Sequence, residues 1–67
     1  MGTLTRLAVL RGRKGWSQAE LAEAAGLDVA TISDLETGRT KRPRVPTLLR
    51  LADALGVELD DLLEEAS

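Results

Sequence analysis

Apolar residues recur along the chain at the three- and four-residue spacing of amphipathic α-helices. This pattern predicts five short helices and no strand, so the expected fold is all-α, a compact five-helix bundle. The positions expected to face the core are, in chain order, Leu4, Leu7, Ala8 and Arg11; Leu21, Ala22 and Ala25; Ile32 and Leu35; Val45, Leu48, Ala52 and Leu55; and Leu59, Leu62 and Leu63.

Capping residues and glycines mark where these helices begin and end. The first helix is expected at about 3–14, with Thr3 or Thr5 as its N-cap, and the fifth at about 58–66. Four glycines are placed to end the first four helices, and one proline is tolerated in the first turn of the fourth. These residues are Gly15, Gly26, Gly38, Gly56 and Pro46.

The second and third helices have the clearest signals. Residues 17–20 (Ser-Gln-Ala-Glu) fit a capping box, in which the Ser hydroxyl and the Glu carboxylate each pair with an otherwise unpaired backbone amide. Trp16 is expected to pack on Leu21 as a hydrophobic staple, the alternative being a stacking platform for a base. Asp28 is expected to be only the N-cap of the third helix. A helix of about eight residues, a turn of three or four and a helix of about nine form a helix-turn-helix arrangement.

Charge is distributed unevenly along the chain. Residues 1–50 contain all nine Lys and Arg and five acids, a local charge of +4, whereas residues 51–67 contain six acids and no base, a local charge of −6. This asymmetry indicates a face that meets a polyanion, although the net charge is −2 and an acidic solubilising tail is the alternative. Four of the nine basic residues fall within 39–44, namely Arg39, Lys41, Arg42 and Arg44.

Composition argues against most enzymes. Without cysteine or histidine the chain has no disulfide, no thiolate or imidazole metal site and no Ser-His-Asp relay. The acids at 60–61 and 64–65 fit a solvated helix face, and residues 12–15 (Gly-Arg-Lys-Gly) lack the spacing of a phosphate loop. We therefore expect no catalytic residue, no metal and no cofactor. Because no long apolar run or signal peptide is present, we expect one soluble, cytoplasmic domain spanning 1–67 that does not enter a membrane.

Four stretches occur in a specific order and spacing, namely Ser17-Gln18-Ala19-Glu20-Leu21-Ala22, Thr31-Ile32-Ser33, Leu35-Glu36-Thr37-Gly38 and Leu51-Ala52-Asp53-Ala54-Leu55-Gly56-Val57. Through them most of the chain, from about residue 4 to residue 63, resembles the Cro/C1-type (Xre-like) helix-turn-helix family of phage repressors and small bacterial regulators. Segment 40–44 is similar to that of a lambdoid phage repressor. The resemblance implies a DNA-binding domain of the phage-repressor type, whose third helix, at about 28–37, enters the major groove while the second crosses the backbone.

The same resemblance assigns roles outside the recognition helix. Gln18 matches a position that contacts phosphate and braces the third helix. Arg11 and Glu36 match a partly buried salt bridge between the first and third helices, a structural role worth about 3–5 kcal/mol if the pair is fully buried. Lys41, Arg42 and Arg44 match positions that bind phosphate or reach towards the minor groove. Basic runs are usually solvated loops, but the place of the 39–44 run after the recognition helix favours phosphate binding. Its members are Arg39, Lys41, Arg42 and Arg44.

The sequence departs from the family at the base-reading positions, where Val29, Ala30 and Asp34 replace the usual Gln, Arg, Ser or Asn. The contacts of Arg with guanine and of Gln with adenine cannot be made from these positions. Val29 and Ala30 can contact thymine methyls, and Asp34 can accept from cytosine N4 or adenine N6 while repelling phosphates. Thr31 and Ser33 either hydrogen-bond to DNA or lie on a plain helix surface. We therefore expect a lower affinity for DNA and a weaker sequence preference than phage repressors show.

Two functions remain open. The first is sequence-selective binding of double-stranded DNA by a transcriptional regulator, usually a repressor that blocks polymerase. It would act as a homodimer at least on DNA, with exposed Leu59, Leu62 or Leu63 as the self-association surface. The second is a protein-interaction module with weak DNA readout, whose partner would be a toxin or a sigma-class factor; Asp34 and the negative net charge favour it. A steep fall of DNA affinity with salt would distinguish the first from the second.

Overall fold

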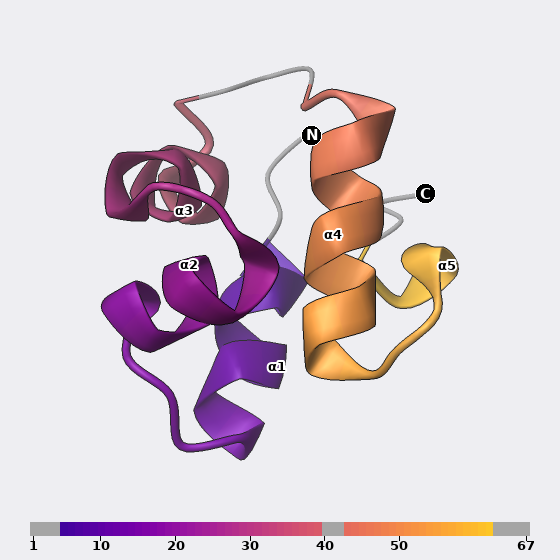
Figure 1. The fold of residues 1–67 in the computed structure, drawn as a ribbon, viewed down its shortest axis with the longest axis horizontal. Helices are drawn as coiled ribbons and strands as arrows, with labels where there is room; N and C mark the ends of the chain where they lie inside the picture. The colour runs from indigo at the N-terminus through magenta and orange to yellow at the C-terminus, as the bar shows by residue number, and fades with distance from the viewer. Residues whose placement is uncertain (1–4, 40–42, 63–67) are drawn as a thin grey trace.

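A computed structural model of the chain describes residues 5–39 and 43–62, and within these ranges it contains five α-helices and no strand (Figure 1). The expected all-α, five-helix fold is confirmed. None of the helices in the described ranges is long and apolar enough to cross a membrane. The helices are α1 (Thr5–Arg13), α2 (Gln18–Ala25), α3 (Val29–Thr37), α4 (Val45–Leu55) and α5 (Leu59–Leu62).

Local signals account for the boundaries of α2 and α3. The Ser17 hydroxyl accepts a hydrogen bond from the Glu20 amide at 3.1 Å, and the Glu20 carboxylate accepts from the Ser17 amide at 2.7 Å, so the capping box is confirmed. Gly26 ends α2 with φ at +72°, a left-handed conformation that costs other residues free energy. Asp28 is the N-cap of α3 as expected, but its side chain makes no capping hydrogen bond.

The core lies where the helices meet, and it is built almost entirely from leucine and alanine. Leu10 and Leu51 are buried although the expected stripes omitted them. Val45 was expected to face the core but is 58% exposed, whereas Leu48, three residues further along the same helix, is buried. The buried residues are Leu7, Leu10, Leu21, Ala22, Ala25, Ile32, Leu35, Leu48, Leu51, Ala52, Leu55 and Leu62.

Within the described residues, α3 is held chiefly by two helices. It packs against α1 and α2, while α2 also packs against α4, and α5 packs against α4 and α1 (Figure 1). The residues of α3 that enter the core are Ile32 and Leu35, as expected. The remaining face of α3 therefore points away from the bundle.

A long-range contact connects the first helix to the last. The Arg6 Nε donates a hydrogen bond to the Asp61 carbonyl oxygen at 3.0 Å, across 55 positions of sequence. Leu62 is fully buried beside this contact, as expected for a core position, so it contributes nothing to a self-association surface on α5. Some expectations lie outside the described residues, namely those for Thr3, Leu4 and Leu63 and for the side chain of Thr5.

Replacing Gly26 by Ala should destabilise the fold by about 1–2 kcal/mol, because alanine pays a steric penalty at positive φ. The added Cβ would also lie 3.1 Å from Arg50 Nη1, although that flexible side chain can move away. Urea unfolding followed by circular dichroism measures the change. Gly12→Ala is the control: Gly12 is helical with open space around it, so stability should rise by about 0.5–1 kcal/mol. Equal effects of the two substitutions would contradict this account of the turn.

Candidate nucleic-acid interface

The outward face of α3 carries the residues that the sequence marked as base readers. Val29 is 45% exposed, and Ala30 beside it is exposed as well. Thr31, Ser33 and Asp34 are half-buried. All five lie on the helix that follows the Gly26 turn, and the structure thus brings these predicted positions together on one element.

Hydrogen-bond donors are scarce on this face. Residues 29–37 contain no Lys, Arg, Asn or Gln, so only hydroxyl groups can donate to a base edge. The Thr37 hydroxyl already donates to the Ser33 carbonyl oxygen at 2.9 Å. The side chains that remain are two apolar groups, the Thr31 and Ser33 hydroxyls and the Asp34 carboxylate.

Behind this face, the Glu36 carboxylate joins α3 to α1 and α2. Arg11 donates to it twice, from Nε to Oε2 at 2.7 Å and from Nη2 to Oε1 at 3.0 Å. Gln18 donates from Nε2 to the same Oε1 at 2.9 Å. Arg11 also donates from Nη1 to the Trp16 carbonyl oxygen at 2.8 Å, which ties down the turn between α1 and α2. Two parallel bonds between guanidinium and carboxylate fix orientation as well as distance.

Both charged groups of this network are perturbed. Burial alone would raise the pKa of Glu36, but the hydrogen bonds from Arg11 and Gln18 and the charge of Arg11 outweigh it and lower the pKa. The pKa of Arg11 is raised, chiefly by its hydrogen bond to Glu36. The Glu36 side chain is only 7% exposed and that of Arg11 21% exposed. The pair therefore stays ionised at neutral pH in a partly desolvated place.

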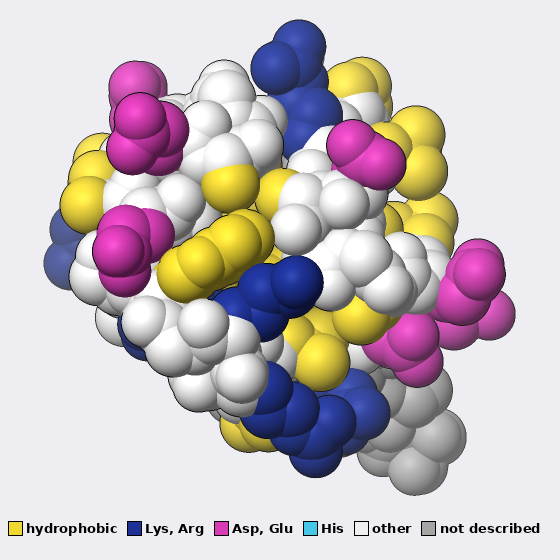
Figure 2. Space-filling model, turned by 60° about the horizontal axis from the view of Figure 1, so that its bottom comes forward, with side chains coloured by type: hydrophobic (Ala, Val, Ile, Leu, Met, Phe, Trp, Pro, Cys, Tyr) yellow, Lys and Arg dark blue, Asp and Glu magenta, His cyan; other side chains and the backbone are white. Residues whose placement is uncertain are grey.

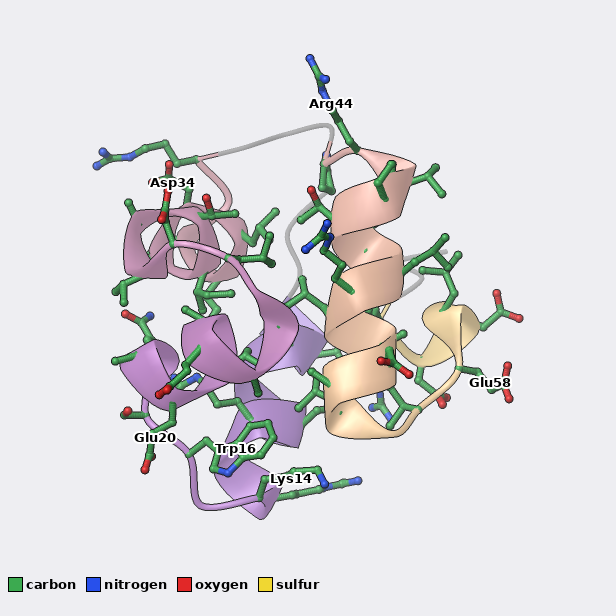
Figure 3. The ribbon with its side chains drawn as sticks, viewed as in Figure 1. Lys14, Trp16, Glu20, Asp34, Arg44 and Glu58 are labelled. Atoms are coloured by element: carbon green, nitrogen blue, oxygen red, sulfur yellow. The ribbon has the colours of Figure 1, made fainter. Side chains whose placement is uncertain are left out.

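Basic side chains flank the outward face of α3. Arg39 directly follows Gly38, and its side chain is 81% exposed. Its Nε lies 3.9 Å from Asp34 Oδ1, a distance at which the exposed ion pair contributes little. Arg44 is exposed and extends away from the bundle near the start of α4 (Figure 3). Lys41 and Arg42, predicted to bind phosphate with them, lie outside the described residues.

Basic charge is not confined to this side of the molecule. Figure 2, in which the bottom of Figure 1 comes forward, shows Lys and Arg side chains from the middle of the view to its lower edge and at its top, with acidic side chains toward its sides. Arg13 ends α1 and Lys14 lies in the turn that follows, where Lys14 Nζ lies 5.3 Å from the centre of the Trp16 ring. Charge alone therefore does not identify the interface, which instead rests on the chemistry of α3.

Trp16 is half-buried and packs against the core, in keeping with the staple interpretation. Sequence reasoning did not find its carbonyl as an acceptor for Arg11, because backbone acceptors carry no residue signature. The hydrogen bond from Gln18 to Glu36 was not predicted either: the family resemblance implied only that Gln18 braces the third helix.

Comparison with known proteins agrees with this geometry. A family model described as a helix-turn-helix domain matches residues 5–66. The chain belongs to the helix-turn-helix domain family. It is similar to the HTH-type transcriptional regulator DdrOP3 of Deinococcus deserti, with 44% identity over 59 residues, 88% of this chain and 45% of that protein.

Two further relatives carry similar names. The HTH-type transcriptional regulator SutR of Escherichia coli is 40% identical over 53 residues, 79% of this chain and 29% of that protein. The uncharacterized HTH-type transcriptional regulator YozG of Bacillus subtilis is 31% identical over 67 residues, all of this chain and 80% of that protein. The chain thus spans less than half the length of DdrOP3 and SutR but most of YozG.

Substituting Glu36 by Gln should lower the free energy of unfolding at neutral pH by about 2–3 kcal/mol, because Arg11 loses its counter-charge. This value lies between those of exposed and of fully buried ion pairs. A carboxylate whose pKa is lowered by folding stabilises the fold above its unfolded pKa. This contribution is lost as the pH falls through the lower, folded pKa. The difference between wild type and variant should therefore shrink below about pH 4.

Urea unfolding between neutral pH and about pH 3 checks this expectation. Asp53→Asn removes an exposed carboxylate from α4 and serves as the control, with an expected effect within about 0.5 kcal/mol. A Glu36→Gln effect that is no larger than that of the control, or that does not change with pH, would be incompatible with the ion pair.

Proposed function

We propose that this chain is the DNA-binding domain of a cytoplasmic transcriptional regulator of the Cro/C1 (Xre-like) type. The observation that carries the proposal is the outward face of α3, held from behind by Glu36 and flanked by exposed Arg39 and Arg44. The family match and the names of the three relatives support the same function. No catalytic residue and no cofactor form part of it.

In this proposal α3 enters the major groove and α2 crosses the backbone above it. An α-helix with its side chains is about 10–12 Å across, which matches a groove about 12 Å wide. Ala30, Ser33 and Asp34 lie opposite the buried side of α3 and so reach base edges, with Val29 and Thr31 at the margins. The pose depends on α1 and α2, because Glu36 fixes the rotation of α3 relative to both.

Phosphate contacts supply most of the affinity. Gln18 uses one Nε2 hydrogen on Glu36, and its amide has a second hydrogen that can go to a phosphate oxygen. The remaining contacts come from the loop after α3, through Arg39, Lys41, Arg42 and Arg44.

We further propose that the chain binds as a homodimer and represses by occupying the DNA that polymerase needs. Helix-turn-helix dimers read two half-sites about one helical turn apart. With Leu62 buried, the large apolar residues exposed on α4 and α5 within the described ranges are Val45 and Leu49, which are 58% and 51% exposed and lie one turn apart on α4. These two are the better candidates for self-association.

Fluorescence anisotropy with a randomised duplex pool at about 50 and about 200 mM salt tests the proposal. Four cations that each neutralise a phosphate predict an affinity loss of about 100-fold per chain over this range. Arg44→Ala should reduce the slope of log affinity against log salt by about one unit. Lys14→Ala removes a cation at the opposite end of the molecule and should leave the slope unchanged (Figure 3).

Absence of binding at about 50 mM salt, with the chain shown to be folded by circular dichroism, would overturn the DNA-binding proposal. The protein-interaction alternative would then account better for Asp34 and the net charge of −2. Stoichiometry from the same titration at high chain concentration checks the dimer: two chains per duplex site are expected, and one chain would contradict it.

The Asp34 carboxylate is proposed to accept a hydrogen bond from cytosine N4 or adenine N6. Selection from the pool with the wild-type chain yields an enriched duplex. Asp34→Ala should change the discrimination between the preferred base and the other bases in this duplex by about 1–3 kcal/mol. It should also strengthen binding to random duplex, because a charge that repels phosphate is removed. Asp53→Ala on α4 is the control. An unchanged preferred site and unchanged affinity for Asp34→Ala would rule out the base-reading role.

A further inference from the structure

The outward face of α3 combines an apolar pair with a single carboxylate. Val29 is the only large exposed hydrophobic residue on this helix within the described ranges; the other three, Val9, Val45 and Leu49, lie on α1 and α4. Ala30 extends the apolar surface, and Asp34 lies one turn beyond Ala30 on the same side of the helix. A methyl group and a hydrogen-bond donor, close together, would complement this arrangement.

The four bases differ in how well they offer such a pair in the major groove. Guanine presents two acceptors, which a carboxylate repels. Thymine presents its C5 methyl next to the O4 acceptor, so the methyl fits but the oxygen does not. Cytosine and adenine each present an amine donor, N4 and N6 respectively, but neither base carries a methyl group. Cytosine methylated at C5 carries the methyl and the amine side by side on one ring.

We propose that α3 reads the C5 methyl group of a pyrimidine through Val29 and Ala30 while Asp34 accepts from the adjacent N4 amine, so that 5-methylcytosine is bound better than cytosine. The inference rests on the proposed function, since it requires α3 in the major groove. The Asp34 side chain is 39% exposed, and its ion pair with Arg39 at 3.9 Å is long, so the carboxylate can accept from a base.

The size of the effect follows from the burial of one methyl group. Transfer of a single CH₂-sized group from water into apolar contact corresponds to about a fourfold gain in affinity. A methyl group in the major groove also changes the mechanics of DNA. Variants of Val29 and Ala30 are therefore needed to distinguish direct contact with the methyl group from an effect of the methyl group on the bending of DNA.

The experiment selects binding sites for the 67-residue chain from a randomised duplex pool in which every cytosine is 5-methylcytosine. In the enriched duplex, each 5-methylcytosine is then replaced singly by cytosine and each thymine by deoxyuridine. Anisotropy competition measures each duplex at one salt concentration. At least one 5-methylcytosine position in each half-site should lose about fourfold in affinity when its methyl is removed.

Matched variants assign the effect to the protein surface. Val29→Thr replaces one methyl group by a hydroxyl at nearly constant volume, and Ala30→Ser adds a hydroxyl at the neighbouring position. One or both should abolish the discrimination between methylated and unmethylated duplex. Val9→Thr makes the same change on α1, where the valine is 49% exposed, and should preserve it. Circular dichroism confirms that each variant is folded.

The outcomes separate this inference from the proposed function. Methyl reading is overturned if binding to the pool depends on salt but no sequence is enriched. It is also overturned if the affinity of the enriched duplex does not change when any methyl group is removed. In both cases the proposed phosphate-binding surface is retained. Discrimination that persists in both Val29→Thr and Ala30→Ser also overturns methyl reading. A methyl effect confined to thymine contradicts the amine contact assigned to Asp34. No binding to the pool at low salt overturns the proposed function itself.

Discussion

The Glu36 carboxylate accepts hydrogen bonds from two helices other than its own, and the position of α3 depends on it. Arg11 holds it with two parallel bonds from α1, and Gln18 adds a third from the first turn of α2. A carboxylate that is 7% exposed is costly to bury without such partners. The geometry in which all three bonds form leaves little freedom for α3 to rotate or slide. A small leucine and alanine core alone would specify this orientation less sharply, since such side chains lack directional contacts.

Short-range features of the fold could be predicted from sequence because their physics is local. The box between Ser17 and Glu20 spans three residues, and glycine placed in the left-handed conformation ends α2 and α3. Burial was harder to predict at the edges of a stripe. Leu51 and Val45 both lie near the apolar side of α4, yet one is fully buried and the other 58% exposed, because burial depends on which neighbours reach each turn.

Some long-range contacts of the fold, and the use of side chains on α3, could not be read from sequence for a related reason. The bond of Arg6 to the Asp61 carbonyl joins positions 55 apart, and its acceptor is a backbone atom that any residue would provide. The residue types on α3 were evident, but their use depends on helix phase, which the structure supplies through the burial of Ile32 and Leu35. Thr37 shows the consequence: an exposed hydroxyl suited to a base edge is already committed to the Ser33 carbonyl. The match with the helix-turn-helix domain family supports the proposal that this face of α3 meets DNA.

The scarcity of donors on α3 distinguishes this surface from one that reads guanine or adenine through Arg, Gln or Asn. In the proposed complex, phosphate contacts carry the affinity, while a small apolar and acidic face carries the sequence preference. The central claim is that this face and its basic flanks meet DNA. The most direct measurement is the amide spectrum of ¹⁵N-labelled chain during titration with duplex DNA at low salt. If the outward face of α3 and its basic flanks meet DNA, the shifts concentrate in α3, at the start of α2 and in residues 38–44, and α5 is little changed. Shifts centred on α4 and α5, or none at saturating duplex, would contradict this claim.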